Sequence, residues 1–520
     1  MIVWPDDEQP WHLWMIGVNT GFYMIVAIIL VYLFLSVKYR IAHPFWSRQP
    51  VFHHMNFSWW VNPPGIIEPR GAVTPATPYY DPWCVRLYEV GSGYTEAELS
   101  TMKNDENSGI GSGGEWVAVA TAVANSVGDL PGGWPSGKIL KQQNLTASAL
   151  RSAWHLVRGH YLRHPGLAEY TPPWNQFISH MLSHSTPAHV GLYYKATTAY
   201  NQDTLSKGTL AVKYDKPVSC MITRPVDCVF LREMRETVAE GKTGLVKTGI
   251  AGMPAVATAA TSRLPAVGYV DFLCTHSDHR KQSITPKLIY SHYKMLKDAE
   301  TSTTAKSTAI PSVFLFKREG ELAPFVPLVV YNSYCYDTLY WPAAGARKDV
   351  EANIIDATNF PLFVRALDHI RDDSANLDIH IQAGHGNLKE QIACGLLVPV
   401  VFIRKNNALA PFIGVVILRI SGTTYRSAGL VELLATYMTG YDERTEEQRR
   451  WFAAMVRDIC VHITHSRKAR YLLIEDLGHT QEVLSELHGK FTAQFFSPTA
   501  YYFYNYATHP ADRHRSWILM

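Results

Sequence analysis

Residues 268–296 read GYVDFLCTHSDHRKQSITPKLIYSHYKML and carry the strongest structural signal in the chain. Apolar side chains at Val270, Phe272 and Cys274 alternate with other residues, which predicts a strand. A short polar turn follows, and Pro286 then opens a segment with helical spacing. The apolar positions of that predicted helix are Leu288, Ile289, Tyr293 and Leu296.

The turn between this strand and this helix contains two cations, Arg280 and Lys281. A strand, a basic turn and a helix N-terminus together favour an anion, because free backbone amides and the helix dipole face it and the cations add charge. The alternative is an ordinary turn with solvated charges. His276 and His279 lie in the same turn and are weaker candidates for a direct role.

The composition of the chain excludes some classes of protein. There are 520 residues, of which 47% are hydrophobic and 18% charged, which argues against wholesale disorder. The length suggests roughly two to four domains. The 48 Lys and Arg residues nearly balance 45 Asp and Glu residues, so we expect no nucleic-acid partner.

A charge-free run, Leu13–Val37, is 25 residues long, enough to cross ~30 Å of hydrocarbon as a helix. Acidic residues precede it, and Lys38 and Arg40 follow it. These flanks predict a single-pass membrane protein with residues 1–12 outside and the main body cytoplasmic. A buried core helix is the alternative, and a cleaved signal peptide fits worse because its first residues are acidic.

Interleaved helix and strand patterns predict an α/β (α+β) body in two halves, 38–347 and 348–520, divided at a charged break, Lys348–Glu351. The Pro- and aromatic-rich segment His43–Trp83 is expected to be an extended arm on the body surface. The other expected elements are a surface loop at 104–138, a helix at 145–162, a strand pair at 208–229 around Asp215-Lys216, an insertion at 240–266, a strand-like stretch at 309–330, a helix at 360–370, strands at 397–404 and 412–420, a helix at 451–465, a strand at 471–475, a helix at 480–487 and a closing strand at 500–506.

The seven cysteines are widely spaced and form no CxxC motif, so they predict neither a zinc ribbon nor a redox pair. His180 and His184 have the i, i+4 spacing of metal ligands, and His189 is nearby. No acidic or cysteine ligand has matching spacing, so we expect no metal site.

Three stretches of the chain resemble the N-myristoyltransferase family. Residues 272–288, FLCTHSDHRKQSITPKL, are similar to its FLC signature, and residues 45–51, FWSRQPV, resemble its FWxTQPV arm. Asp476-Leu477, Phe491 and residues 501–506, YYFYNY, resemble its closing elements. The similarity covers 43–520 and excludes the membrane helix. It implies two pseudo-symmetric GNAT-like halves with mixed sheets flanked by helices.

The resemblance also implies roles for individual residues. The backbone amides of Phe272 and Leu273 would form an oxyanion hole for a thioester carbonyl. The α-carboxylate of Met520 would accept a proton from the N-terminal glycine of a peptide or protein substrate. The co-substrate would be myristoyl-CoA or another long-chain acyl-CoA. Its binding residues would be Phe45, Trp46, Gln49, Arg280 and Lys281, and the candidates for binding the acceptor are Asp476 and Tyr504.

Two departures from the family pattern leave alternatives open. The family's acidic loop corresponds to Arg158–Glu169, which is basic here, and its Tyr-Trp-His segment has no clear counterpart in Pro311–Tyr334. The leading hypothesis is a membrane-anchored N-myristoyltransferase-like enzyme. The main alternative is a degenerate acyltransferase scaffold in a membrane assembly, for example at the inner membrane of a large DNA virus. A GNAT-type acetyltransferase of another amine is the third.

Overall fold

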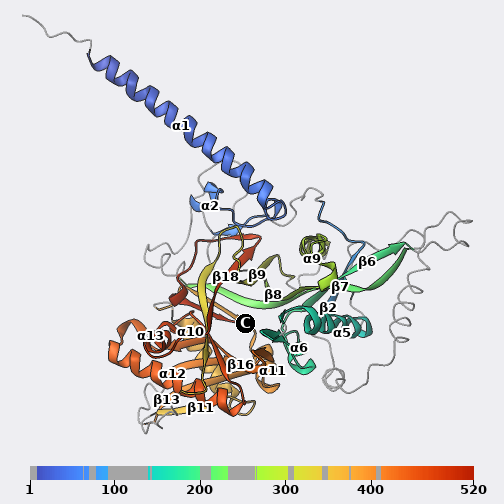
Figure 1. Cartoon of the computed structure of the whole chain (residues 1–520), viewed down its shortest axis with the longest axis vertical. Helices are drawn as coiled ribbons and strands as arrows, with labels where there is room; N and C mark the ends of the chain where they lie inside the picture. The colour runs from blue at the N-terminus through green and yellow to red at the C-terminus, as the bar shows by residue number, and fades with distance from the viewer. Residues whose placement is uncertain are drawn as a thin grey trace, which may run out of the picture.

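A computed structural model gives the arrangement of the chain (Figure 1). Sequence predictions for the acidic N-terminal flank, the loop at 104–138 and nearly all of the insertion at 240–266 lie outside the described residues. The described residues are 9–61, 64–68, 78–91, 139–140, 143–164, 166–198, 212–231, 264, 266–302, 310–341, 350–373, 376–405 and 412–520.

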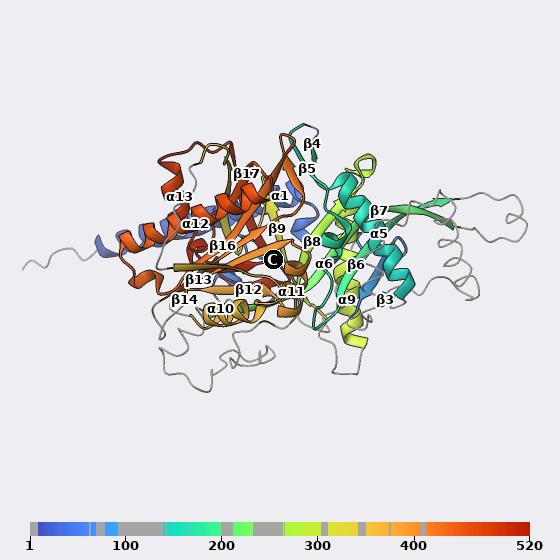
Figure 2. The same cartoon turned by 90° about the horizontal axis from the view of Figure 1, so that it is seen from below.

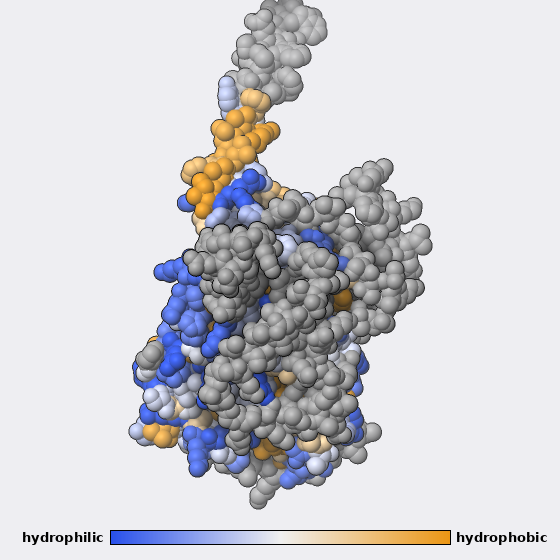
Figure 3. Space-filling model, turned by 90° about the vertical axis from the view of Figure 1, so that its right-hand side faces the viewer, coloured by the Kyte–Doolittle hydropathy of each residue, from blue (hydrophilic) through white to orange (hydrophobic). Residues whose placement is uncertain are grey.

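Helix α1 (Gln9–Ala42) projects from the body of the molecule (Figure 1). Within its stretch Thr20–Ala42, an 18-residue window has a mean hydropathy of 2.3, and none of that window is buried. Figure 3 shows this part as a column of apolar residues that projects from the body. The helix is long and apolar enough to cross a membrane, and it contains the whole of the expected span Leu13–Val37.

The first half is built around an antiparallel sheet that continues into a strand–helix–strand unit. Its last two strands run parallel, which requires a crossover, and a helix provides it. The elements are β6 (Ala188–Thr198), β7 (Val212–Phe230), β8 (Val267–Thr275), α9 (Ile284–Ser302) and β9 (Val313–Glu319), with β2 (Val85–Val90) beside β6 and with α5 (Gln143–His160) and α6 (Trp174–Ser179) contributing to the core.

The second half repeats the same order of elements. Three strands pair antiparallel, and a long helix then leads to a strand parallel to the third. These elements are β13 (Leu397–Arg404), β14 (Phe412–Arg419), β16 (Ala428–Met438), α12 (Glu446–Ser466) and β17 (Tyr471–Glu475).

Each half gives one strand to the other. Strand β10 (Val329–Asp337) follows β9 in the chain but pairs with β17 of the second half. Strand β18 (Phe495–Tyr504) follows the second half but pairs with β9 of the first. The two exchanged strands also pair with each other. Separating the halves would leave the backbone groups of both strands without partners, so the halves form one sheet.

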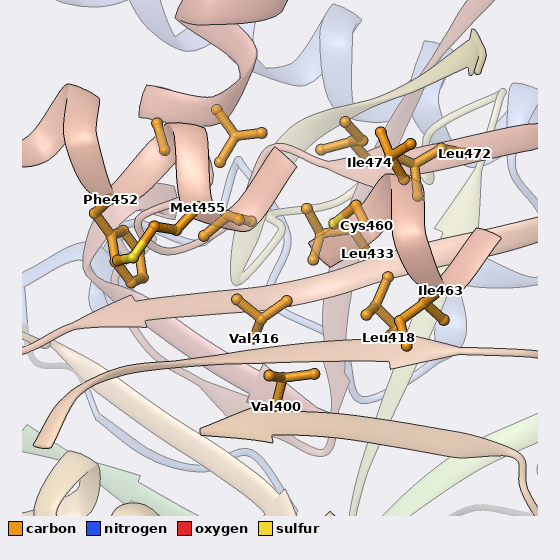
Figure 4. Packing of buried hydrophobic residues seen from close by; sticks show 14 of the residues in the cluster. Val400, Val416, Leu418, Leu433, Phe452, Met455, Cys460, Ile463, Leu472 and Ile474 are labelled. Carbon is orange, nitrogen blue, oxygen red and sulfur yellow. The ribbon is translucent and has the colours of Figure 1, made fainter. Parts of the chain in front are cut away.

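Helix α12 shows why the second half packs as it does. A capping box of Thr445 and Gln448 satisfies its first amides. Its apolar residues recur every three or four positions, which places them on one face. Figure 4 shows this face against the sheet, where Phe452 and Met455 lie on the side of Val416 and Ile463 lies beside Leu418.

The remaining helices and strands complete the described structure. The arm after α1 returns to the body, where Gly65 and Ile66 pair with Ala507 and Tyr506. The remaining elements are β1 (Gly65–Ile66), β3 (Ile139–Leu140), β4 (Arg163–His164), β5 (Ala168–Tyr170), β11 (Val350–Ile354), β12 (Ile379–Ala383), β15 (Thr423–Tyr425), β19 (Tyr506–Ala507), β20 (Ser516–Leu519), α2 (Phe57–Val61), α10 (Phe360–Asp372), α11 (His385–Ala393), α13 (Gln481–His488) and the 3-10 turns Trp46–Arg48, Ser277–His279, Tyr441–Glu443 and Arg513–Arg515.

Most sequence predictions for regular elements are confirmed, within a few residues at their ends. They are the strand and helix of 268–296, the helices at 145–162, 360–370, 451–465 and 480–487, and the strands at 397–404, 412–420 and 471–475.

Two predictions were wrong. The described part of 208–229 is one strand, β7, because a register irregularity between Tyr214 and Pro217 absorbs the expected turn. The stretch 309–330 holds one strand and a loop before β10. The strand expected at 500–506 is present as the end of β18 and the start of β19, but β20 follows it as the last strand.

Candidate active site

Strands β8 and β9 separate in the middle of the sheet. Their parallel pairing ends at Val270 and Phe316, and β8 continues to Thr275 with β7 as its strand neighbour. The β7–β8 register shifts at the same point, which makes Asp271 the extra residue of a β-bulge. In a regular strand, successive amides point to opposite edges, and a bulge breaks this alternation. The sheet is therefore open and irregular beside the backbone of Phe272.

An apolar cavity of about 410 Å³ lies at this opening. The arm closes one side of it, because the Trp46 ring stacks on Phe316 with a centroid distance of 6.0 Å. Thr285 and Pro286 at the start of α9 also line it. The lining includes Phe45, Trp46, Met221, Leu273, Ile289, Tyr293, Phe314 and Tyr504.

A second, polar cavity of about 520 Å³ adjoins the apolar one. Both cavities share part of their lining, which is Tyr161, Val270, Asp271, Lys317 and Arg318. Phe272 and Met520 line the polar cavity. The two cavities therefore meet at the bulge of β8, one able to hold an apolar chain and the other a polar group.

The end of the chain reaches the polar cavity through β20. This strand pairs parallel to β12 in the interior of the body, and Figures 1 and 2 both show the C-terminus at the centre of the molecule. Met520 is only 3% exposed. Chain ends normally lie on the protein surface, whereas Met520, the residue that bears the terminal carboxylate, lines the same cavity as Phe272.

Asp271, the bulge residue, belongs to a buried charge network. Its carboxylate accepts a hydrogen bond of 2.6 Å from Nε of Arg224 and lies 3.4 Å from Nδ1 of His180. Arg224 also donates to Asn387 on α11. Burial alone would raise the pKa of Asp271, but Arg224 and His180 outweigh it and lower the pKa to about 2. Asp271 is therefore a fixed negative charge at neutral pH.

Other ion pairs line the polar cavity. Lys317 Nζ lies 2.7 Å from both Glu319 and Glu475. Burial opposes the ammonium form of Lys317, but these carboxylates raise its pKa well above the ordinary value. Arg419 donates to Glu432, which also accepts from Ser421 at 2.6 Å. These ion pairs offset part of the cost of removing the charged groups from water.

In the basic turn before α9, Arg280 is hydrogen-bonded to the protein backbone, whereas Lys281 faces solvent. Arg280 donates to the carbonyl oxygens of His160, the last residue of α5, and Thr275. Lys281 is exposed, and both it and Ser283 have positive φ angles, 62° and 58°. Such left-handed residues turn backbone amides toward a common concavity, a feature of anion sites.

The structure separates the remaining candidates. Gln49 is 4% exposed, and its Oε1 accepts a 2.6 Å hydrogen bond from Tyr504. Tyr504, a candidate for binding the acceptor, lines the apolar cavity and is not among the described residues that line the polar one. Asp476 forms an ion pair with Arg513 at 3.3 Å and is not among the described residues that line either cavity.

Sequence reasoning missed the charged residues of the polar cavity. Lys317, Arg419, Glu432 and Glu475 come from four different strands, and no local pattern joins them. One sequence signal could have indicated them, because a charged residue within an otherwise apolar strand, such as Glu432 in β16, needs a buried partner. Within the described residues, no group of three His, Cys, Asp or Glu side chains is arranged to hold a metal ion.

Comparisons with solved structures identify the fold. Three Saccharomyces cerevisiae N-myristoyltransferase structures with bound myristoyl-CoA, one of them also with inhibitors, match with TM-scores of 0.55, 0.55 and 0.54. Identities are 11%, 10% and 11%, with 91%, 92% and 90% of this chain and 90%, 99% and 91% of those chains covered. No family model and no curated protein matches the chain by sequence. The chain therefore shares the two-lobed α/β fold of these enzymes.

The charge of Asp271 has a measurable effect on stability. Because its pKa of about 2 lies below the ordinary 3.8, ionised Asp271 contributes about 2–3 kcal/mol to the free energy of unfolding. This contribution is complete above pH ~4 and disappears as the pH falls through about 2. Asp271→Asn, assayed by denaturant unfolding at neutral pH, should lose at least this amount.

Asp278→Asn is the matched control, since its side chain is 78% exposed in the neighbouring turn. We expect a change within ~0.5 kcal/mol for this exposed position. Equal effects of the two substitutions, or a difference between wild type and Asp271→Asn that does not shrink between pH 4 and pH 2, would contradict the assignment.

Proposed function

We propose that the chain is a membrane-anchored N-acyltransferase that moves a long acyl chain, myristoyl foremost, from acyl-CoA to the N-terminal glycine amine of a peptide or protein. The observation that carries the proposal is that Met520, the buried residue that bears the terminal carboxylate, lines the same cavity as Phe272. An enclosed carboxylate beside an opened strand and an apolar cavity is the arrangement that direct acyl transfer needs.

The apolar cavity fits the acyl-CoA. Its volume lies within the usual range of ligand sites, and one end opens at the N-terminus of α9, where phosphates are favoured. Gln49 Nε2 is buried without a hydrogen-bond partner, which leaves a donor for a ligand beside Phe45 and Trp46. Lys281 and the amides of the 280–284 turn would bind phosphate, and Arg280 would support this turn through α5.

The polar cavity fits the acceptor amine. Both halves line it, whereas every residue lining the apolar cavity except Tyr504 precedes residue 348. We therefore infer that 38–347 is the acyl-CoA side and that 348–520 completes the peptide side. The preference for glycine rests on the resemblance to N-myristoyltransferases.

The reaction would proceed by direct attack. The acceptor's α-ammonium group, with a pKa near ~8, loses one proton to the Met520 carboxylate, which passes it to solvent. The neutral nitrogen attacks the thioester carbon, and the amides of Phe272 and Leu273 donate to the oxygen on which charge develops. The C–S bond breaks, an amide bond forms, and the thiolate of coenzyme A takes the second nitrogen proton.

The anchor places this site close to the membrane. Only His43 and Pro44 separate the end of α1 from Phe45 in the wall of the apolar cavity. The arm also contacts α1, through a 3.2 Å hydrogen bond between Tyr39 and His53. A single myristoyl chain binds a bilayer only marginally, so acylation at the surface would favour capture of the product there.

The direct test is transfer by the full chain in detergent, with labelled myristoyl-CoA and a panel of peptides that begin with glycine. We expect label on the N-terminal amine of some peptides and none on matched peptides whose amine is acetylated. Tight acyl-CoA binding without transfer across the panel would contradict the enzyme and favour a scaffold.

Filling the apolar cavity should shorten the acyl chain that binds. Ile289 on α9 lines this cavity and is half-buried. Because each buried methylene is worth ~0.8 kcal/mol, Ile289→Trp should weaken myristoyl-CoA binding at least about tenfold and leave butyryl-CoA nearly unchanged. Ile289→Leu is the matched control and should keep the wild-type preference in the same binding assay. Unchanged myristoyl-CoA affinity in Ile289→Trp would place the acyl chain elsewhere.

The anchor is tested by extraction. The full chain should resist alkaline carbonate, and paired Ile28→Lys and Leu30→Lys should release it, since each lysine costs ~3 kcal/mol in mid-membrane. Paired alanines at these positions are the control and should stay in the membrane fraction.

The orientation of the anchor is tested by proteolysis. Protease should reach the body only from the cytoplasmic side. Release of the wild-type chain, or digestion from outside, would refute the anchor or its orientation.

A further inference from the structure

A third cavity, of about 740 Å³, lies on the other face of the sheet that carries the C-terminus. In β12, Ile379 and Ile381 pack in the apolar cluster that contains Met520. His380 and Gln382 alternate with them, so they point to the opposite face and line this cavity. This cavity shares no described lining residue with the apolar or the polar cavity.

Two side chains in this wall are buried without complete hydrogen bonding. His380 is 1% exposed, and neither ring nitrogen has a partner. Gln382 is 5% exposed, and its Oε1 has none. Burial lowers the pKa of His380 to about 3, so the neutral ring offers one donor and one acceptor. Burying such groups without partners is unfavourable, and hydrogen bonds to a polar ligand would offset that cost.

Helix α11 begins at the same cavity. Its N-cap, Gly384, provides no side-chain hydrogen bond, and Gly384, His385 and Gly386 line the cavity. A Cβ at Gly386 would lie 2.5 Å from the carbonyl oxygen of Ser183, so only glycine permits this close approach. The first amides of α11 and its dipole favour a negative charge here.

The charged side chains around the cavity have both signs. Arg371 on α10 borders it, while also pairing with Asp368 at 3.1 Å and Asp372 at 3.3 Å. Asp227 on β7 is the carboxylate in the lining, and it pairs with Gln382 in the sheet register. An anionic group therefore fits near α11 and Arg371, and a hydroxyl or amine fits near Asp227.

We propose that this cavity is a second ligand site, which binds a small organic molecule carrying a phosphate or carboxylate group together with a hydroxyl or amine. The anion binds the first amides of α11 and Arg371, while His380 and Gln382 bind the body of the ligand. Nothing in this assignment depends on acyl transfer, because this cavity and the polar cavity share no described lining residue.

The test uses the full chain in detergent, with inorganic phosphate and acetate as probes and chloride at equal ionic strength as reference. Calorimetric titration and the thermal midpoint are measured together. We expect one or both probes to bind and to raise the midpoint above that in chloride. Comparing phosphate with acetate distinguishes the two anion classes.

Three variants locate the binding. His380→Leu should raise the midpoint of the unliganded protein, because it removes unpaired buried groups, and should weaken probe binding at least about fivefold. Arg371→Gln should weaken it similarly. Arg365→Gln, on the exposed side of the same helix, is the charge-matched control and should bind as wild type does.

Phosphate can also bind the basic turn before α9, so Lys281→Gln is measured in parallel. A loss of binding in His380→Leu and Arg371→Gln, with Lys281→Gln retaining it, supports the second site. A loss confined to Lys281→Gln, equal loss in Arg365→Gln, or failure of both probes to bind the wild-type chain overturns it. None of these outcomes depends on whether the chain transfers acyl groups.

Discussion

Four residues of strand, Ser516–Leu519, hold the end of the chain inside the body. Their parallel pairing with β12, which itself pairs with the long strand β7, places Met520 beside the bulge of β8. Most of the proposed chemistry depends on this placement, because Met520 bears the carboxylate that is proposed to accept the proton of the acceptor amine. The strand exchange of β10 and β18 holds the surrounding sheet together, so the position of β20 depends on both halves.

The electrostatics of the site follow from the same topology. Strands from both halves converge on the polar cavity, and each contributes a charged residue whose partner lies on another strand. Lys317 on β9 meets Glu475 on β17, and Asp271 on β8 meets Arg224 on β7. These ion pairs offset part of the cost of burying the charged groups of the cavity. The arrangement keeps the cavity polar and rigid beside an apolar cavity that fits an acyl chain.

Local patterns predicted the elements of the fold but not the contacts of the site. The alternation of Val270, Phe272 and Cys274 and the spacing after Pro286 predicted β8 and α9, since period and capping act over a few residues. The pairs Lys317–Glu475 and Asp271–Arg224 join residues that are 158 and 47 positions apart, and no short-range signal encodes them. The turn expected at Asp215-Lys216 failed because tertiary pairing of β7 with β6 outweighed the local turn preference. The proposed roles of Phe272, Leu273 and Met520 came from the resemblance, and the structure brings Phe272 and Met520 to one cavity.

The central claim is that the carboxylate of Met520 takes the proton of the acceptor amine. The most direct measurement compares the full chain with a semisynthetic chain that ends in a carboxamide, which keeps the shape of the terminus and removes its charge. A lost general base should lower the rate of transfer by at least about 100-fold, while the dissociation constant for myristoyl-CoA stays within about twofold. A carboxamide chain that transfers the acyl group at the wild-type rate would contradict the account.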